Sequence, residues 1–391
     1  MNVYERALKL HEELAGKIDI HPTCELKNKD DLSLAYSPGV AEPCRKIYEN
    51  KDDVYKYTWK GNIVAVVSDG SAVLGLGDIG PEAGLPVMEG KAVLFKQFGG
   101  VNAIPIMLDT KDPDEIVNIV KRMAPTFGGI NLEDISAPRC VQIERRLIEE
   151  LDIPVFHDDQ HGTAIVVTAA LINALKLVNK KPEDCKLVVS GTGAAGSSII
   201  KMLHAFGIRN ILAFNSRGVL NRRHNDKYNF VAAEIANMTN EQQVDCTLRE
   251  AMQGADIFLG VSVKNIVDQD MVRSMNRDAI VFGMANPDPE IPYEEAKAAG
   301  ARVVGTGRSD YPNQVNNVLA FPGLFKGALS VRARKITEEM KMAAAVGIAK
   351  IAEEEGLSDD HVIPSAFHPK VAEVVAAEVA KKAVEQGLNR I

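Results

Sequence analysis

Residues 186–207 read KLVVSGTGAAGSSIIKMLHAFG, which is a short apolar run, a glycine-rich turn and a helical segment in that order. In this position glycines allow a tight turn, and the N–H groups at the start of the following helix can approach a pyrophosphate. A bare GxGxxG pattern also suits an ordinary turn, but the strand before it and the helix after it favour a dinucleotide site. The cofactor-binding residues expected from this pattern are Gly191, Gly193, Ala194, Ala195 and Gly196.

The next apolar run, ILAF at 211–214, ends in Asn215, Ser216 and Arg217 and not in the Asp or Glu that usually binds the ribose of NAD. A carboxylate there repels a 2′-phosphate, whereas Asn, Ser and Arg side chains accommodate one. The loop therefore favours NADP modestly over NAD. A solvated basic loop is the alternative, because Arg222 and Arg223 follow closely and loop arginines are common at surfaces.

The rest of the chain alternates between strand-like and helix-like segments. Upstream, the strands are expected at 103–108, 127–132 and 153–156, with Asp112, Pro113 and Glu115 opening the first helix between them. A long apolar helix at 163–178 then leads to a second series of strands, expected at 186–190, 211–214, 256–260, 279–284 and 302–307. The last ~65 residues read as helices that cover the domains. We expect an α/β chain with a first domain at 1–160 and a Rossmann-like domain with C-terminal helices at 161–391.

Acidic residues follow two neighbouring strands of the first series. Glu133 and Asp134 come after the strand at 127–132, and Asp158 and Asp159 come just after the next one. A right-handed helical crossover makes these strands parallel, so the carboxylates emerge at the same edge of the sheet. Carboxylates that close repel one another unless a divalent cation binds them, and oxygen ligands favour Mg²⁺ or Mn²⁺. The alternative is that Asp134 and Asp159 only cap the helices that follow.

Two further residues, Lys91 and Tyr36, do not indicate a function by themselves. Lys91 ends MEGK and precedes the apolar segment AVLFKQF, so it is expected at the start of a helix, where the macrodipole disfavours a cation. Such a lysine is either turned to solvent or placed near a compensating anion, and taken alone the solvent-exposed position is the more common. Tyr36 in AYSPGVAEPC reads as a turn residue.

Composition excludes several classes of protein. The 391 residues are 46% hydrophobic and 25% charged, which is typical of globular proteins, and the net charge of −8 disfavours nucleic acid as a partner. The five scattered cysteines form no CxxC pair, which indicates a reducing compartment. The N-terminus lacks the apolar core of a signal peptide, and no charge-free run reaches the ~18 residues of a membrane span. We expect a cytoplasmic protein that contacts neither nucleic acid nor membrane.

Eight motifs along residues 20–330 together resemble the malic enzymes, in their short bacterial and archaeal form. In chain order they are YSPGVAEP, SDGSAVLGLGDIG, MEGKA, INLEDISAP, FHDDQHGTA, GTGAAGSS, ANPDPEI and PNQVNNVLAFPG. The resemblance implies an N-terminal malic-enzyme domain before the dinucleotide-binding domain, L-malate as substrate and a homodimer.

The resemblance also assigns roles to individual residues. It makes Tyr36 the general acid and Lys91 the general base, with Glu133, Asp134 and Asp159 as metal ligands and Asp158 beside them. Asn286 resembles a residue that touches cofactor and substrate, and Asn317 one that touches substrate. The longer eukaryotic enzymes have an arginine for the substrate carboxylate in the block that here reads Ser71-Ala72. Ser71 is therefore the expected substrate contact at that block, together with Lys91.

The function expected from this resemblance is oxidative decarboxylation of L-malate to pyruvate and CO₂ with reduction of NAD(P). This reaction needs a base that takes the C2 hydroxyl proton, a cation near the C2 oxygen, and an acid that protonates the enolate. Two alternatives remain open at this point. They are an NAD(P)-dependent 2-hydroxy acid dehydrogenase without decarboxylation and a non-catalytic nucleotide-sensing regulator.

Overall fold

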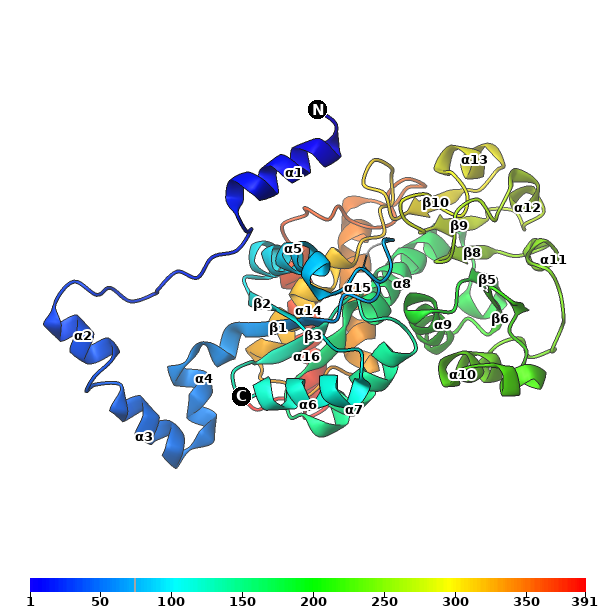
Figure 1. The fold of residues 1–391 in the computed structure, drawn as a ribbon. Coiled ribbons are helices and arrows are strands. Elements are labelled where there is room, and N and C mark those ends of the chain that lie inside the picture. The colour runs from blue at the N-terminus through cyan, green and yellow to red at the C-terminus, as the bar shows by residue number, and fades with distance from the viewer. Residues whose placement is uncertain (74) are drawn as a thin grey trace.

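The computed structural model describes residues 1–73 and 75–391. It contains two β-sheets that lie side by side, helices that cover them, and an N-terminal arm that stands away from the rest (Figure 1).

The first sheet has four parallel strands in the order β2-β1-β3-β4. Its elements are β1 (Ile63–Ser68), α5 (Pro81–Gly99), β2 (Asn102–Met107), α6 (Pro113–Met123), β3 (Gly129–Leu132), α7 (Arg139–Glu150) and β4 (Val155–His157). Every residue of β1 is buried, as expected for a central parallel strand with both faces covered. Its alternate side chains divide between two cores: Val64 and Val66 face the C-terminal helices, whereas Ile63, Ala65 and Val67 face α6 and α7.

Helix α8 (Asp158–Val178) follows β4 directly and connects the two sheets. It is the one helix in the described part of the chain that is long and apolar enough to cross a membrane, yet 72% of its apolar stretch is buried inside the protein. Apolar residues on all sides of a helix also fit a fully enclosed core helix. We therefore assign α8 to the protein core.

The second sheet has six strands in the order β10-β9-β8-β5-β6-β7, all parallel except β7. Its elements are β5 (Lys186–Ser190), α9 (Ala194–Phe206), β6 (Asn210–Asn215), β7 (Gly218–Val219), α10 (Phe230–Met238), α11 (Leu248–Met252), β8 (Ile257–Gly260), α12 (Gln269–Arg273), β9 (Ile280–Gly283), α13 (Tyr293–Ala298) and β10 (Val303–Thr306). The chain leaves β5 toward β6 on one side and returns to β8 on the other. Ligands of open α/β sheets bind at such a switch point.

The C-terminal helices are α14 (Phe321–Ser330), α15 (Glu338–Glu355) and α16 (Val371–Glu385). They share one hydrophobic core with α8, with α9 and with the β1 residues that face them. Phe95 of α5 contacts Phe321 and Phe325 of α14, with ring centroids 4.7 and 5.4 Å apart. These helices therefore cover the first sheet as well as the domain that precedes them in sequence.

The N-terminal arm comprises α1 (Val3–Leu14), α2 (Lys29–Ala35), α3 (Ala41–Glu49) and α4 (Val54–Tyr57). No residue of α1, α2 or α3 is buried, although each helix carries apolar side chains. Lys17 joins the arm to α5 through its backbone N–H, which donates to Glu89, and through its Nζ, which donates to the Pro86 carbonyl. Helices α2 and α3 stand clear of the body in Figure 1.

The expected strands all form, within one or two residues of their predicted ends. Asp112 caps α6 by accepting from the backbone N–H groups of Asp114 and Glu115, as predicted. Two helix starts were wrong. Helix α8 begins at Asp158 and not at residue 163. Helix α5 begins at Pro81, ten residues before Lys91, and continues through Pro86. Proline is well suited to the first helical position that Pro81 occupies. Lys91 therefore lies in a helix interior, and the macrodipole argument does not apply to it.

Candidate active site

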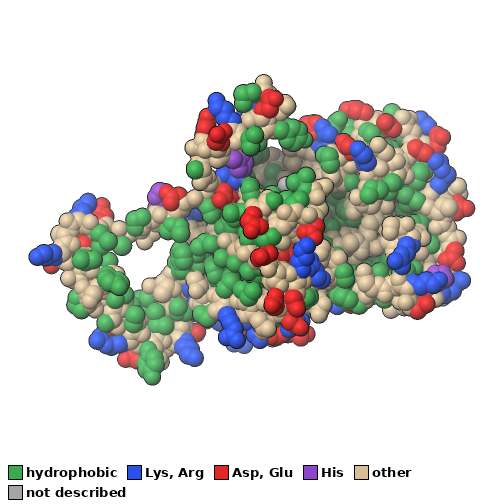
Figure 2. All heavy atoms as spheres, viewed as in Figure 1, with side chains coloured by type: hydrophobic (Ala, Val, Ile, Leu, Met, Phe, Trp, Pro, Cys, Tyr) green, Lys and Arg blue, Asp and Glu red, His purple; other side chains and the backbone are tan. Residues whose placement is uncertain are grey.

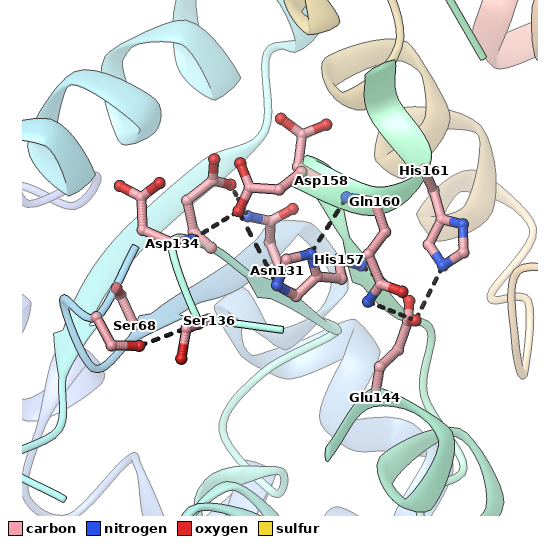
Figure 3. A network of polar contacts seen from close by, with 12 residues as sticks. Ser68, Asn131, Asp134, Ser136, Glu144, His157, Asp158, Gln160 and His161 are labelled. Atoms are coloured by element: carbon pink, nitrogen blue, oxygen red, sulfur yellow. Dashed lines mark hydrogen bonds and ion pairs between the residues drawn. The ribbon is translucent and has the colours of Figure 1, made fainter. Parts of the chain in front are cut away.

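Four carboxylates meet at the carboxyl edge of the first sheet. Strands β3 and β4 are parallel, with Leu132 opposite His157, so Glu133 and Asp134 leave one strand beside Asp158 and Asp159 of the next. Asp159 Oδ2 accepts the backbone N–H of Asp134 at 2.8 Å. Carboxylate oxygens of Glu133, Asp134 and Asp159 lie within 4.8 Å of one another. Figure 3 shows Asp134 and Asp158 of this group near the strand ends and the first turn of α8.

Lys91 enters this cluster from α5. Its Nζ lies 2.9 Å from Glu133 Oε1 and 2.6 Å from Asp158 Oδ2, and the side chain is 8% exposed. Lys91 belongs to the buried face of α5 together with Met88, Ala92 and Phe95, which recur at helical spacing. The Nζ also lies 4.3 Å from the centre of the Phe321 ring of α14. Lys91 is thus held between two anions and an aromatic face. Of the two alternatives for this lysine, the position near a compensating anion is confirmed and the solvent-exposed position was wrong.

Burial and mutual repulsion set the protonation of the carboxylates. Burial raises the pKa of Glu133 to about 7, against the lowering effect of Lys91 and with a further rise from Asp159. Burial likewise raises the pKa of Asp158 to about 7 and that of Asp159 to about 6, although Lys91 opposes both shifts. Burial alone would lower the pKa of Lys91, but Asp158 and Glu133 raise it above its ordinary value. The raised pKa values of Glu133, Asp158 and Asp159 show that this buried site disfavours so many carboxylate charges around one ammonium.

A divalent cation fits this donor set. Glu133, Asp134 and Asp159 offer three converging carboxylate oxygens, which suits Mg²⁺ or Mn²⁺ better than a metal that prefers nitrogen or sulfur. A bound cation would also offset the repulsion that raises the carboxylate pKa values. The capping alternative does not hold for Asp159. Its carboxylate bonds across to Asp134, and His157 is the residue that caps α8.

Of the two asparagines predicted from the second half of the chain, Asn317 contacts the carboxylate cluster and Asn286 lies in a nearby loop of the second sheet. Asn317 opens a short 3₁₀ turn before α14, and its Nδ2 donates to Asp158 Oδ2. Asn286 is exposed in the loop after β9. A Cβ on Gly75 would lie 3.2 Å from the Asn286 carbonyl oxygen, and one on Gly307 would lie 3.0 Å from its Nδ2. Asn286 therefore lies where the loop after β1 meets the second sheet.

Ser71 lies in the loop after β1 and is committed to local contacts. Its hydroxyl donates to Asp69 Oδ1 at 2.5 Å and accepts the Ser136 N–H at 3.0 Å. Arg139 of α7 joins the same group, because its Nη2 lies 2.9 Å from the Ser71 hydroxyl and 3.1 Å from Asp69 Oδ2. Arg139 thus holds the loop at Asp69 and Ser71 in place. The next residue of this loop, Ala72, donates its N–H to the Asp134 carbonyl at 3.0 Å, which keeps the loop beside Asp134. Sequence reasoning missed Arg139, which nothing in its local pattern sets apart.

Tyr36 lies apart from the cluster within the single chain. It ends α2 on the arm and is 69% exposed, and Figure 1 shows α2 separated from the sheet that carries the carboxylates. The fold brings Lys91, Asp158 and Asn317 into contact, but it does not bring Tyr36 of the same chain to them.

The glycine-rich loop joins β5 to α9 at the switch point of the second sheet. Gly191 has a φ of +102°, and a Cβ there would lie 2.4 Å from the Val261 carbonyl oxygen. A Cβ on Gly196 would lie 1.9 Å from the Gly191 carbonyl oxygen, whereas nothing lies within 4 Å of a Cβ on Gly193. Helix α9 begins at Ala194, so Ala194, Ala195 and Gly196 form its first turn. Their N–H groups occupy the position that binds a pyrophosphate in this fold.

The β6 loop is a tight hairpin. Asn215 pairs with Gly218 across β6 and β7, which leaves Ser216 and Arg217 at the turn. Asn215 Oδ1 accepts the Arg217 N–H at 2.8 Å, and Arg217 Nη1 donates to the Lys227 carbonyl at 3.0 Å. The two later arginines point elsewhere, since Arg222 and Arg223 donate to the segment at 241–243.

Three buried polar residues near the carboxylates were not singled out by sequence reasoning. Asn131 of β3 donates to Glu133 Oε2 at 2.8 Å. Glu144 of α7 and His157 at the end of β4 are also buried there. Asn131 interrupts the apolar run GINL and Glu144 lies on an otherwise apolar helix face, so a polar residue at a core position was the available signal.

Comparison with known proteins finds a family match for each half of the chain. The family described as "Malic enzyme, N-terminal domain" matches residues 15–148, and "Malic enzyme, NAD binding domain" matches residues 160–384. The "Bifunctional malic/malolactic enzyme" of Bacillus subtilis is 57% identical, with 100% of this chain and 95% of that protein covered. The "NAD-dependent malic enzyme" of Geobacillus stearothermophilus is 54% identical, with 100% and 81% covered.

The relatives differ in cofactor. The "NADP-dependent malic enzyme" of Haemophilus influenzae is 49% identical, with 98% of this chain and 53% of that protein covered. Among solved structures, the malic enzyme from Pyrococcus horikoshii is 48% identical and superposes with a TM-score of 0.94, covering 100% of this chain and 92% of that one.

Proposed function

Because this chain belongs to the malic enzyme family, we propose that the carboxylate cluster and Lys91 are where it converts L-malate to pyruvate and CO₂ with reduction of NAD(P). The observation that carries this proposal is Lys91 Nζ, bound between Glu133 and Asp158 next to three converging carboxylates. The family relation argues against a dehydrogenase without decarboxylation and against a non-catalytic regulator.

Each group has a separate task in this scheme. A divalent cation held by Glu133, Asp134 and Asp159 would polarise the C2 oxygen of malate and stabilise negative charge on the enolate. Lys91 first passes its ammonium proton to Asp158 and then takes the proton of the C2 hydroxyl as hydride leaves C2 for the nicotinamide. A cation bound at the carboxylates would favour the neutral amine, because it opposes the rise that Asp158 and Glu133 cause in the pKa of Lys91. Asp158 supports this step by accepting a proton from Lys91, since its Oδ2 lies 2.6 Å from Nζ and its pKa is raised to about 7. Asn317 orients Asp158 through its Nδ2.

The remaining task is protonation of the enolate carbon C3 after CO₂ has left. We assign it to Tyr36, supplied by the arm of a second copy of this chain. Among the described residues, sixteen of the twenty-six exposed large hydrophobic side chains lie within the first 59 residues. So much exposed apolar surface on an arm marks an interface. Figure 2 shows hydrophobic side chains on the arm and on the part of the body that faces it.

Complementation between two inactive variants tests this homodimer. Tyr36→Phe removes the acid and Lys91→Ala removes the base, so each variant alone should be inactive. If Tyr36 acts on the partner's site, a hybrid dimer has one intact site, and an equal mixture refolded together should regain about a quarter of wild-type activity. If Tyr36 acts within its own chain, both sites of the hybrid are defective and the mixture stays inactive.

For the cofactor we propose NADP in preference to NAD. Asn215, Ser216 and Arg217 lie at the turn that follows the second strand of the dinucleotide fold, where no carboxylate is present to repel a 2′-phosphate. The relatives include enzymes of both kinds. A cytoplasmic location also stays a prediction from the cysteine content.

The direct test of the reaction is formation of NADPH and NADH with L-malate and Mn²⁺, with CO₂ measured in the same reaction. We expect one CO₂ for each reduced cofactor. Reduced cofactor without CO₂ would support the simple dehydrogenase, and no turnover would support the regulator. In Lys91→Ala we expect oxidation to be lost while cofactor and metal binding stay nearly intact, because a proton acceptor has been removed.

A further inference from the structure

Glu144 is a buried carboxylate that makes no contact with Lys91 or with the metal-site carboxylates, yet it is closely bound to the residues around them. It lies on α7 and is 3% exposed. Its Oε1 accepts the backbone N–H of His157 at 3.0 Å, and its Oε2 lies 3.2 Å from Gln160 Nε2 and 2.9 Å from His161 Nε2. Figure 3 shows Glu144 below the first turn of α8, with Gln160 and His161 directed toward it.

All three donors belong to the segment that carries two of the site carboxylates. His157 ends β4 and caps α8, and Gln160 and His161 follow Asp158 and Asp159 in the first turn. A rotation or shift of this turn would move both aspartates. One carboxylate from a separate helix therefore fixes the place where α8 begins.

The same network orients the imidazole of His157. Its Nδ1 accepts the Gln160 backbone N–H at 3.3 Å, so in the neutral ring the proton is on Nε2. His157 Nε2 is fully buried, has no hydrogen-bond partner within 3.5 Å, and lies 3.9 Å from Asp159 Oδ2. The Nε2 of His157 thus lies beside Asp159, one of the three carboxylates of the metal site, without a hydrogen bond to it.

His161 and Lys341 keep the Glu144 carboxylate ionised. Burial alone would raise the pKa of Glu144, but His161 together with Lys341 of α15 lowers it to about 2. The carboxylate therefore stays ionised near neutral pH, and it keeps its oxygens available for all three donors.

We propose that Glu144 is a positioning residue for the divalent-metal centre, acting through His157 on Asp159 and through the first turn of α8. The inference rests on the proposed metal site. Glu144 does not hydrogen-bond to a ligand itself, but it holds the turn that carries Asp158 and Asp159. Where outer contacts fix the orientation of metal ligands, their loss weakens metal binding by about 10- to 100-fold.

The test compares Glu144→Gln with a control variant, Asp256→Asn. Asp256 is 7% exposed and also binds three donors, namely Lys180 Nζ, the Lys186 N–H and Asn276 Nδ2, but it lies just before β8 of the second sheet. Both variants should lower the thermal unfolding temperature. Mn²⁺ binding is then measured on the full chain stripped of metal, by the electron paramagnetic resonance signal of free Mn²⁺, without substrate or cofactor.

In Glu144→Gln we expect at least tenfold weaker Mn²⁺ binding, because the amide has one acceptor oxygen for three donors. The Mn²⁺ concentration for half-maximal rate should rise in parallel, with an unchanged KM for the dinucleotide. In Asp256→Asn we expect wild-type Mn²⁺ binding. Equal Mn²⁺ affinity in wild type and Glu144→Gln would overturn the inference, whereas no Mn²⁺ binding by wild type would refute the metal site itself.

A second variant, His157→Asn, tests the same inference without altering Glu144. Asparagine is a good helix N-cap and keeps the backbone N–H that donates to Glu144, but its amide is too short to reach Asp159. Weaker Mn²⁺ binding by this variant, with a retained fold, supports the inference. Wild-type Mn²⁺ affinity in His157→Asn would show that His157 does not help to position Asp159.

Discussion

Gly162 lies in the second turn of α8, and substitution by alanine there should damage the site with little damage to the fold. A Cβ at this position would lie 1.9 Å from Asp158 Oδ1 and 3.0 Å from Asn317 Cβ. Because van der Waals contact needs about 3.5 Å, the Asp158 carboxylate must move by about 1.5 Å. A misplacement of about 1 Å in catalytic machinery costs on the order of 100-fold in rate. Alanine otherwise favours the helix by up to about 1 kcal/mol.

We therefore expect Gly162→Ala to lower kcat/KM for malate by about 100-fold or more, with a small change in thermal unfolding temperature. The matched control is Gly90→Ala in α5, where the nearest atom to a Cβ is Lys17 Nζ at 3.6 Å, and where activity should stay at the wild-type level. Steady-state kinetics and thermal unfolding of both variants decide the matter. A Gly162→Ala enzyme with wild-type kcat/KM would refute the packing of Gly162 against Asp158.

Three further outcomes are expected. Asp134→Ala should raise the Mn²⁺ concentration for half-maximal rate by at least about tenfold, or about 1.4 kcal/mol, because one anionic ligand is lost; unchanged metal dependence would argue for a structural role. At saturating malate, kcat/KM should favour NADP over NAD by roughly ten- to 100-fold, and Asn215→Asp combined with Arg217→Ala should reverse this; a wild-type preference for NAD would show that this loop does not contact the ribose. Burial raises the pKa of Cys140 to about 12 and that of Cys185 to about 11, so little thiolate exists at pH 8 and neither thiol should react with a disulfide reagent until the chain unfolds. Rapid labelling of either one in the folded protein, read by peptide mass, would contradict their burial.

Local order along the chain was sufficient to predict the strands, the glycine loop and the acidic edge. Strand positions follow from short apolar runs, and the loop at 191–196 needs only the strand before it and the helix after it. The meeting of Glu133 with Asp159 follows from one rule, because right-handed crossovers bring the carboxyl ends of neighbouring parallel strands together.

Other features depended on packing between distant segments. Lys91 was predicted at a helix start, because MEGK directly precedes the apolar segment AVLFKQF. Its buried ion pairs form only when α5 packs on β1 and β2 and beside α14, so that Nζ reaches Glu133 after β3. Asn317 and Asp158 are 159 residues apart in sequence, and their contact exists because the segment before α14 returns to the first sheet.

The sequence by itself thus determined which chemical groups this protein carries and at which sheet edges they emerge, because periodicity, turn residues and crossover handedness act over short stretches of chain. The tertiary structure decided the partners of those groups. Glu144 reaches α8 from another helix, and Tyr36 extends from the body on an arm. Such contacts depend on how whole helices pack and on which surfaces remain exposed, and these are properties of the folded chain that no local pattern contains.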